Sequence, residues 1–312
     1  MAPGPKLLTM PNRLKKGDTV GVAAPAGPVD AKQLEAGLKT VRRMGLNPVC
    51  GKHLLARDGF LAGTDAERAE DLMSMFRDPE VKAIFCARGG YGVNRILSRL
   101  DAKVIRKNPK VVVGSSDITL LLLYLQKKCS MTAFYGPMVA GSFGGREMKI
   151  SATGFWRMLS GQKQARKMSA SAARVLKPGK AEGQLAGGCL TLLCRSLKTP
   201  YEVDTRGKIL LIEDVNEPAY RIDGMLWQLR QAGKFRHVSA VIFGEMVNCK
   251  FNAGQAGTLD AMLGEFFKSD SFPVLTNCPI GHGEEIWTLP LGVGAKLNAK
   301  TKSLVLESCG VT

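Results

Sequence analysis

Histidine and aromatic residues are scarce in this sequence of 312 residues, which holds three histidines and 6% Phe, Trp and Tyr. No aromatic residues alternate with the basic clusters, so stacking platforms for single-stranded nucleic acid are missing. Long apolar runs are also absent. The longest, residues 118–125, falls far short of the roughly 20 residues that a membrane-spanning helix needs. We therefore expect neither nucleic-acid binding nor a membrane span.

The eight cysteines include no C-x-x-C pair. Several stand in apolar runs, as Cys86 does within residues 83–87. This pattern predicts buried free thiols and argues against a zinc site or a disulfide framework, so no metal and no cofactor are expected. Residues 1–6 show no basic segment leading into a long apolar one, so no secretory signal is evident and the cytoplasm is the default location.

Acidic residues are outnumbered, 27 against 44 Lys and Arg, which gives a net charge of +17. The basic residues are dispersed, with local concentrations at 13–16, 103–110 and 163–180. Such a surface raises the local concentration of small anionic substrates. A small anionic molecule is therefore a more natural partner than a nucleic acid.

Short apolar segments alternate with helical ones from residue 17 to about residue 140. Strands are expected at 17–25, 47–50, 81–86 and 109–113, and helices at 30–44, 65–76, 93–100 and 118–128. This alternation predicts an α/β domain with a mostly parallel sheet covered by helices on both faces.

A second α/β unit is expected from residue 183, with strands at 208–212, 238–243 and 303–307 and a helix at 223–231. Between the units, residues 161–182 are polar, basic and rich in Ser and Ala, which suggests a linker or crossover. The expected organisation is therefore a first domain at 1–160, a linker at 161–182 and a second domain at 183–312.

The segment Gly114-Ser115-Ser116-Asp117 separates a valine-rich strand from a leucine-rich helix. A serine at a sharp strand-to-helix turn is lifted off the sheet, and N–H groups of the helix start point towards it, as in a nucleophile elbow. The match is partial, because Gly-x-Ser is followed by Asp and not by x-Gly. On this segment alone, a plain helix cap is the more ordinary interpretation.

A serine nucleophile needs a base, and His282 is the best placed of the three histidines. Gly281 and Gly283 flank it, which frees the backbone and leaves the imidazole uncrowded. We interpret His53 and His237 as ordinary histidines, either at the surface or with hydrogen-bond partners for their polar atoms.

Carboxylates that could orient such a base follow the apolar strand at 208–212. Ligands gather at the carboxyl ends of parallel strands, so this position suits a functional acid. The order Ser…Glu…His occurs in hydrolases on α/β sheets, although order alone is weak evidence. The candidate acids are Glu213, Asp214 and Glu217.

Further motifs extend along nearly the whole chain, from residue 16 to about residue 306. They are Gly17-Asp18-Thr19-Val20 with Ala24-Pro25, Leu61-Ala62-Gly63-Thr64-Asp65 with Glu67-Arg68, Ala87-Arg88-Gly89-Gly90-Tyr91-Gly92, Gly114-Ser115-Ser116-Asp117-Ile118-Thr119, Tyr135-Gly136-Pro137-Met138, residues 213–223 (EDVNEPAYRID), Gly281-His282-Gly283 and Leu289-Pro290-Leu291-Gly292.

In these motifs the chain resembles the LD-carboxypeptidases of serine peptidase family S66, the murein tetrapeptide carboxypeptidases, which also include the microcin C self-immunity proteins. The resemblance implies a nucleophile, an acid and a base at Ser116, Glu213 and His282. It implies an oxyanion hole from the backbone N–H groups of Asp117 and Gly90. Substrate contacts are expected at Tyr91, Tyr135, Gly136 and Glu217.

The resemblance also implies an N-terminal α/β domain related to class I glutamine amidotransferases, a smaller C-terminal α/β domain and a homodimer. The implied activity is release of terminal D-alanine from cytoplasmic murein tetrapeptides by cleavage of an L,D-peptide bond, during cell-wall recycling. The alternatives are hydrolysis of another amide, such as a microcin C-like peptidyl nucleotide, and a non-catalytic peptide-binding protein.

Three positions depart from the family pattern. Cys189 stands where Asn is usual, Gly224 follows Asp223 where Arg is usual, and Tyr135 replaces the His of a common Phe-His pair. None of them removes an implied catalytic residue. They bear instead on how the substrate is held.

Overall fold

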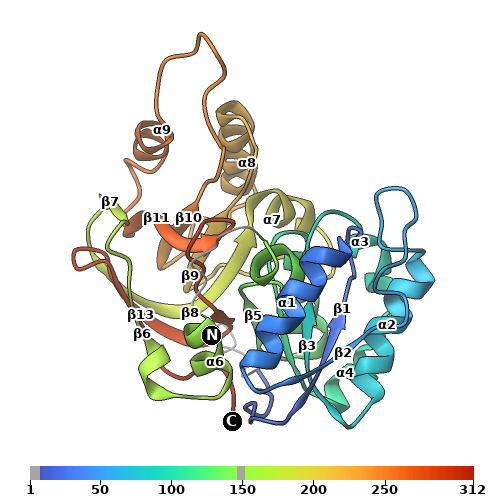
Figure 1. The fold of residues 1–312 in the computed structure, drawn as a ribbon. Helices are drawn as coiled ribbons and strands as arrows, with labels where there is room; N and C mark the ends of the chain where they lie inside the picture. The colour runs from blue at the N-terminus through green and yellow to red at the C-terminus, as the bar shows by residue number, and fades with distance from the viewer. Residues whose placement is uncertain (1–7, 146–151) are drawn as a thin grey trace.

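The computed structural model describes residues 8–145 and 152–312. Residues 1–6, on which the expectation about a secretory signal rests, lie outside this range. Two β-sheets lie side by side, each with its own helices (Figure 1). Within the two described ranges, no helix is long and apolar enough to cross a membrane.

The first sheet has six strands in the order β12-β5-β4-β3-β1-β2. Its strands are β1 (Thr19–Ala23), β2 (Asn47–Cys50), β3 (Val81–Cys86), β4 (Val111–Gly114), β5 (Ala133–Tyr135) and β12 (Leu289–Leu291). The first five are parallel, as predicted, and apolar runs such as β4 are fully buried. β12 pairs antiparallel with β5, so a segment from the second half of the chain completes the first sheet.

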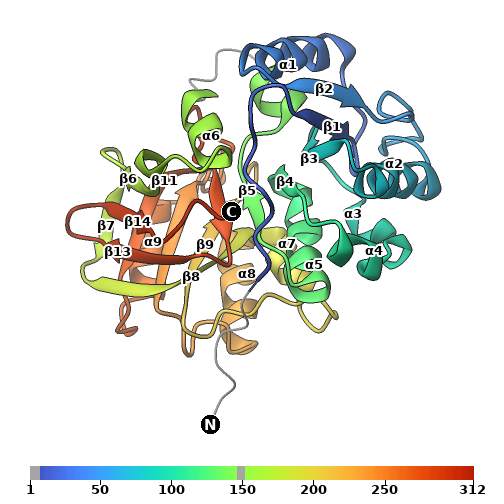
Figure 2. The same cartoon turned by 90° about the horizontal axis from the view of Figure 1, so that it is seen from below.

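Helices pack around this sheet (Figure 2). They are α1 (Ala31–Arg43), α2 (Asp65–Arg77), α3 (Val93–Ile96), the 3-10 turn η1 (Leu97–Arg99), α4 (Ala102–Lys107), η2 (Ser116–Ile118) and α5 (Thr119–Cys129). Local signals explain where they begin: Asp30 accepts the N–H of Gln33 at 2.9 Å, and Thr64 forms a capping box with Glu67. The helix predicted at 93–100 is α-helical only to Ile96.

The second sheet has eight strands in the order β6-β14-β13-β8-β9-β10-β11-β7. The strands are β6 (Lys167–Ser169), β7 (Arg174–Lys177), β8 (Lys180–Cys189), β9 (Lys208–Glu213), β10 (Ala240–Glu245), β11 (Val274–Gly281), β13 (Gly294–Asn298) and β14 (Ser303–Leu306). β8 to β11 are parallel, and antiparallel strands flank them on both sides.

Residues 161–182 differ from the expected linker. They contain β6, β7 and the start of β8, and β6 and β7 form the two opposite edges of the second sheet. These edge strands are difficult to recognise in the sequence for two reasons. They are polar, and their partners β14 and β11 lie about 100 residues or more further along the chain.

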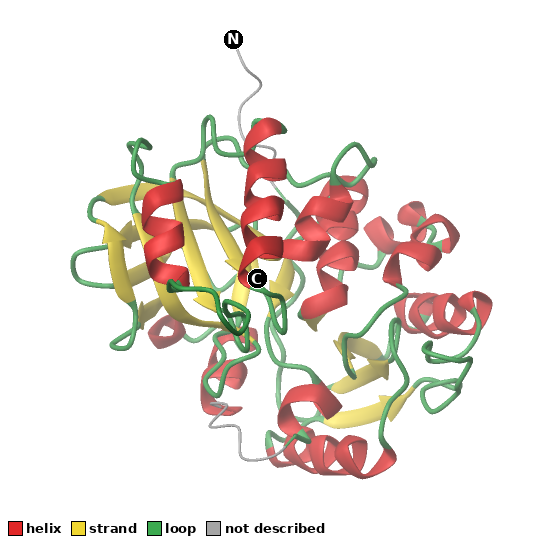
Figure 3. Cartoon of the chain, turned by 90° about the horizontal axis from the view of Figure 1, so that it is seen from above, coloured by secondary structure: helices red, strands yellow, loops and turns green. Residues whose placement is uncertain are grey.

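The remaining helices are η3 (Val139–Phe143), α6 (Ala152–Leu159), η4 (Lys163–Arg166), α7 (Leu190–Ser196), α8 (Ala219–Gln231) and α9 (Leu259–Phe266). Figure 3 shows helices lying across the strands of the second sheet. α8 begins four residues before the predicted helix at 223–231, because Pro218 serves as its N-cap. The carboxyl ends of β4, β5, β9 and β11 carry the residues that form the site.

Candidate active site

Ser116 lies two residues after the end of β4, in a left-handed backbone conformation with φ at 60°. This region is uncommon for residues other than glycine, and it marks the sharp turn of a nucleophile elbow. Ser115 has an extended backbone and forms no side-chain cap bond, so the plain helix-cap interpretation does not hold for it. Ser115 is 1% exposed, whereas Ser116 is partly exposed.

The Asp117 carboxylate caps a different helix from the one it precedes. It accepts the backbone N–H of Val93, the first residue of α3, at 2.9 Å. Burial raises the pKa of Asp117, and this hydrogen bond and the positive charges of Arg195 and Arg68 oppose that rise. The side chain thereby ties the serine turn to the glycine-rich turn after β3.

That glycine-rich turn packs directly against the serine. A Cβ atom at Gly89 would lie 2.7 Å from the Cβ and 2.8 Å from the Oγ of Ser116, so only glycine fits. Gly90 and Gly92 have φ of 117° and 124°, which also favour glycine. The buried guanidinium of Arg68 donates to the carbonyl of Gly92 at 2.9 Å and holds the turn in place.

Glu213, the last residue of β9, contacts His282, which follows β11. The Nδ1 atom of His282 lies 2.7 Å from Oε2 of Glu213. The Glu213 side chain is fully buried and that of His282 is 23% exposed. Burial lowers the pKa of His282, but the charge and hydrogen bond of Glu213, with a contribution from Asp214, outweigh this and leave the pKa raised.

Gly281 makes this pair possible. Its φ is 103°, and its α-carbon packs so closely against the Glu213 carboxylate that any Cβ would overlap with it. The glycine before His282 therefore serves two needs at once, a positive φ and space for the acid.

Tyr135, the last residue of β5, joins the two halves of the site. Its hydroxyl accepts the backbone N–H of Ser116 at 3.1 Å and donates a short hydrogen bond to Oε1 of Glu213. The residue is 0% exposed. This placement favours a role in holding the site together over the substrate contact predicted for it.

Of the other two candidate acids, neither contacts His282 in a hydrogen bond among residues 8–145 and 152–312. Asp214 accepts the backbone N–H and the hydroxyl of Thr191, at 2.9 and 2.8 Å. Glu217 pairs with Nε of Arg221 at 2.9 Å, and its side chain is 16% exposed. Within the described ranges, Glu213 is thus the one of the three acids that hydrogen-bonds His282.

Two further predicted substrate contacts lie beside the site. Tyr91, in the glycine-rich turn, is 37% exposed, and its ring meets that of Phe60 edge-on at 5.6 Å. Phe60 is 65% exposed and had no signal in the sequence that pointed to it. Gly136 follows Tyr135 and faces Thr288, from which a Cβ atom at this position would lie 3.3 Å away, a tight contact.

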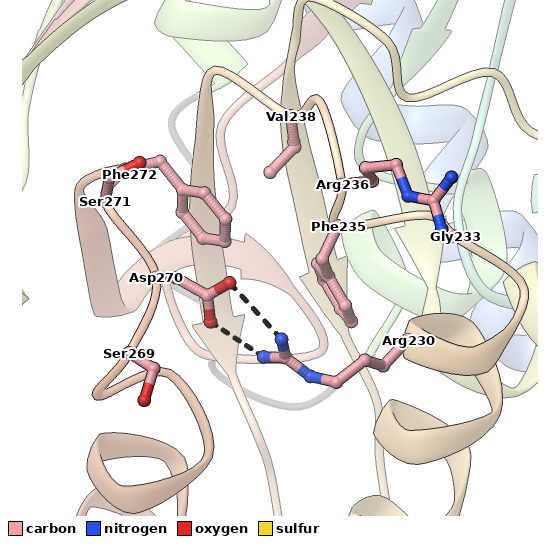
Figure 4. A pocket seen from close by; sticks show the side chains of 9 residues that line it. All are labelled: Arg230, Gly233, Phe235, Arg236, Val238, Ser269, Asp270, Ser271 and Phe272. Carbon is pink, nitrogen blue, oxygen red and sulfur yellow. Dashed lines mark hydrogen bonds and ion pairs between the residues drawn. The ribbon is translucent and has the colours of Figure 1, made fainter.

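A cavity lies away from these residues. About 420 Å³ in volume, it stands at the end of α8, and the Arg230–Asp270 ion pair (2.7 Å) spans it (Figure 4). It contains none of the predicted site residues. Its lining residues are Arg230, Gly233, Phe235, Arg236, Val238, Ser269, Asp270, Ser271 and Phe272. In the part of the chain that the structure describes, no cluster of three or more His, Cys, Asp or Glu could hold a metal.

A serine on an elbow and a Glu–His pair on a second α/β unit define the class of serine hydrolases. Comparison with known families gives the narrower assignment. Residues 20–136 match the LD-carboxypeptidase N-terminal domain and residues 182–297 match the LD-carboxypeptidase C-terminal domain. The chain belongs to the LD-carboxypeptidase family of serine peptidases, S66.

Comparison with individual relatives supports the same family assignment. The chain is 39% identical to a probable murein peptide carboxypeptidase of Bacillus subtilis, over 96% of this chain and 94% of the relative. It is 31% identical to a murein tetrapeptide carboxypeptidase of Pseudomonas aeruginosa, over 89% and 92%. Among solved structures, the microcin C7 self-immunity protein MccF with adenosine monophosphate aligns with a TM-score of 0.89 at 27% identity, over 96% and 98%.

Proposed function

We propose that this protein hydrolyses the L,D-peptide bond that holds the terminal D-alanine of murein tetrapeptides. The observation that carries the proposal is the Glu213–His282 pair, bonded at 2.7 Å and linked through Tyr135 to the turn that presents Ser116. The relatives named as murein peptide carboxypeptidases supply the substrate class.

The hydrogen bond to Glu213 fixes which proton His282 can move. Because Nδ1 donates to the carboxylate, Nε2 is left as the acceptor for the hydroxyl proton of Ser116. In the structure as described, no hydrogen bond joins the Ser116 hydroxyl to His282. Such bonds commonly tighten when substrate binds.

The reaction then follows acyl transfer. Ser116 Oγ attacks the carbonyl carbon of the L,D-bond, and the carbonyl oxygen becomes an oxyanion beside the backbone N–H groups of Asp117 and Gly90. His282 returns the proton to the amine of the departing D-alanine. Water, deprotonated by His282, then hydrolyses the acyl-enzyme and frees the serine.

Substrate recognition in this proposal involves the groups around the serine. Tyr91 lies two residues from Gly89, which packs against the serine, and Gly136 donates its N–H to the carbonyl of Gly114 at 3.1 Å. Glu217 lies four residues beyond the catalytic acid. The basic character of the chain suits a substrate with several carboxylates. Cys189 is buried in register with Glu213 and Gly224 is exposed on α8, so of these two departures from the family pattern only Cys189 touches the site.

A homodimer and a cytoplasmic location belong to the same proposal. Both rest on the family resemblance. All eight cysteines are free, seven of them buried, which suits a reducing compartment.

The direct test is a release assay on the purified protein. Murein tetrapeptide ending in D-alanine is compared with the same peptide ending in L-alanine, and free D-alanine is measured by an oxidase-coupled reaction. We expect release from the first peptide only, and none from the Ser116→Ala variant. Absence of D-alanine with the wild-type protein contradicts the proposal.

A second candidate function is hydrolysis of a peptidyl nucleotide amide, as the alignment with the microcin C7 self-immunity protein suggests. The same assay separates the two, with an aminoacyl sulfamoyl adenosine as the alternative substrate. Cleavage of this compound without release of D-alanine from tetrapeptide would favour the second function.

A further inference from the structure

The hydroxyl of Tyr135 has two hydrogen-bond partners that belong to different sheets. Tyr135 ends β5 and pairs in register with Gly114, two residues before the serine. Its ring reaches β8 of the second sheet, where Gly188 leaves the space for it. The residue therefore stands at the junction of the two sheets, fully buried.

The direction of both hydrogen bonds follows from chemistry. The backbone N–H of Ser116 can only donate, so the phenol oxygen is its acceptor. The single phenolic proton then points to Oε1 of Glu213. Burial and the negative charge of Glu213 raise the pKa of Tyr135 well above its ordinary value, so this proton stays in place.

The two oxygens of Glu213 thus have separate partners. Oε1 accepts from Tyr135, and Oε2 accepts from His282. Resting on the function proposed above, we infer that Tyr135 is a positioning residue, which fixes the turn of Ser116 to the acid of the second sheet and moderates the charge that Glu213 presents to His282. Tyr135 itself touches neither substrate nor the reacting atoms.

Removal of the hydroxyl has two consequences. The N–H of Ser116 loses its acceptor, so the left-handed turn that aims Oγ is held less firmly. Glu213 loses a donor and presents more negative charge, so the pKa of His282 rises further. Because the base must be neutral to accept a proton, the acidic limb of the pH–rate profile moves to higher pH.

The protonation and hydrogen bonds of the other titratable groups near Glu213 and His282 should not change when the Tyr135 hydroxyl is removed. Burial raises the pKa of Cys249 to about 11 and that of Cys189 well above its ordinary value, so both thiols remain protonated. Asp214 keeps its two bonds from Thr191. The groups facing Glu213 and His282 from neighbouring elements are Cys189, Asp214, Glu245 and Cys249.

The test compares Tyr135→Phe with Tyr124→Phe. Tyr124 is also buried, 7% exposed, and its hydroxyl donates to the carbonyl of Leu100 at 2.8 Å, remote from the serine. Both variants lose one buried hydroxyl. We expect kcat for D-alanine release to fall by roughly 10- to 100-fold in Tyr135→Phe, with KM little changed and the acidic limb shifted upwards. Tyr124→Phe should keep the wild-type kcat and pH profile.

A second variant covers the case in which Tyr135→Phe does not fold. Site-specific replacement of Tyr135 by 3-fluorotyrosine keeps the shape and makes the phenol a stronger donor. The acidic limb should then move to lower pH, opposite to the Phe variant. A limb that stays in place in either folded variant, together with wild-type kcat, overturns the inference.

A failure of the proposed function can be distinguished from a failure of the inference about Tyr135. If the wild-type protein releases no D-alanine, the rate at which a fluorophosphonate labels Ser116 replaces kcat in the same comparison. Slower labelling in Tyr135→Phe than in Tyr124→Phe, with the upward pH shift, then supports the positioning role, and equal labelling rejects it.

Discussion

The two sheets contribute to the site by different physical means. The first supplies Ser116 through backbone geometry: a left-handed φ of 60° and a neighbouring glycine with no room for a side chain. The second supplies Glu213 and His282 through side-chain electrostatics: a fully buried carboxylate bonded at 2.7 Å to an imidazole whose pKa it raises. The position of the nucleophile thus depends on steric fit, whereas the protonation of the base depends on charge.

This difference predicts that mutations in the two sheets have different signatures. A change in the first sheet should displace the nucleophile and leave the pH dependence alone. A change in the second should alter the protonation of the base. Tyr135, which contacts both, should affect the two properties together.

The largest effect is expected on the first sheet. Ser116→Ala should lower kcat/KM for D-alanine release by about 10⁶-fold, as loss of the nucleophile does in other serine hydrolases. Ser115→Ala is the matched control, because Ser115 is buried next to it and has an ordinary extended backbone. A fall with Ser115→Ala and not with Ser116→Ala would show that the nucleophile is assigned to the wrong serine.

Glu213→Gln tests the second sheet. The rate should fall by roughly 10⁴-fold, as when the orienting carboxylate of a triad becomes an amide. The Glu213 charge raises the pKa of His282, so its removal should lower that pKa and move the acidic limb of the pH–rate profile to lower pH. Asp214→Asn removes only the smaller contribution of Asp214 to that pKa and should shift the limb less, and an unshifted limb in Glu213→Gln contradicts the charge-based account.

Gly89→Ala tests the steric fit around Ser116 without changing any charge. Its Cβ would press on Ser116 at 2.7 to 2.8 Å, and a displacement of about 1 Å at the nucleophile costs about 10²-fold in rate. The pH profile should not move. Gly224→Ala, in an exposed helical position with open space around it, should instead stabilise the protein by about 0.5–1 kcal/mol at full activity. Thermal unfolding and kcat/KM of both variants provide the measurement.

The smallest effect concerns stability. Since the pKa of His282 is raised in the folded protein, its contribution is complete below its ordinary value of about 6.5 and is lost as pH rises through the folded value. From acid to alkaline pH, the Tm advantage of the wild type over His282→Gln should therefore shrink. Thermal unfolding of both proteins across this pH range is the measurement, and a Tm advantage that stays constant contradicts the expectation.

Much of the first sheet could be predicted, because its strands and helices alternate along the chain and pair with near neighbours. Thr64 with Glu67 and Asp30 with Gln33 are local signals, readable without a structure. The edge strands β6 and β7 and the strand β12 could not be foreseen, because their partners are distant and their sequences are short or polar.

The residues of the site also fall into two groups, those to which the local sequence points and those whose contacts depend on the tertiary structure. The sequence singled out the turn at Ser115 and Ser116 and the glycine-flanked His282, because a turn and its residue types are local, and the family resemblance pointed to Ser116 as the nucleophile. The tertiary structure decided which of three acids faces the histidine, and it moved Tyr135 from an expected substrate contact to a buried link between the sheets. The physical reason is that a hydrogen bond between strand ends depends on the pairing and packing of distant segments, which no local pattern encodes.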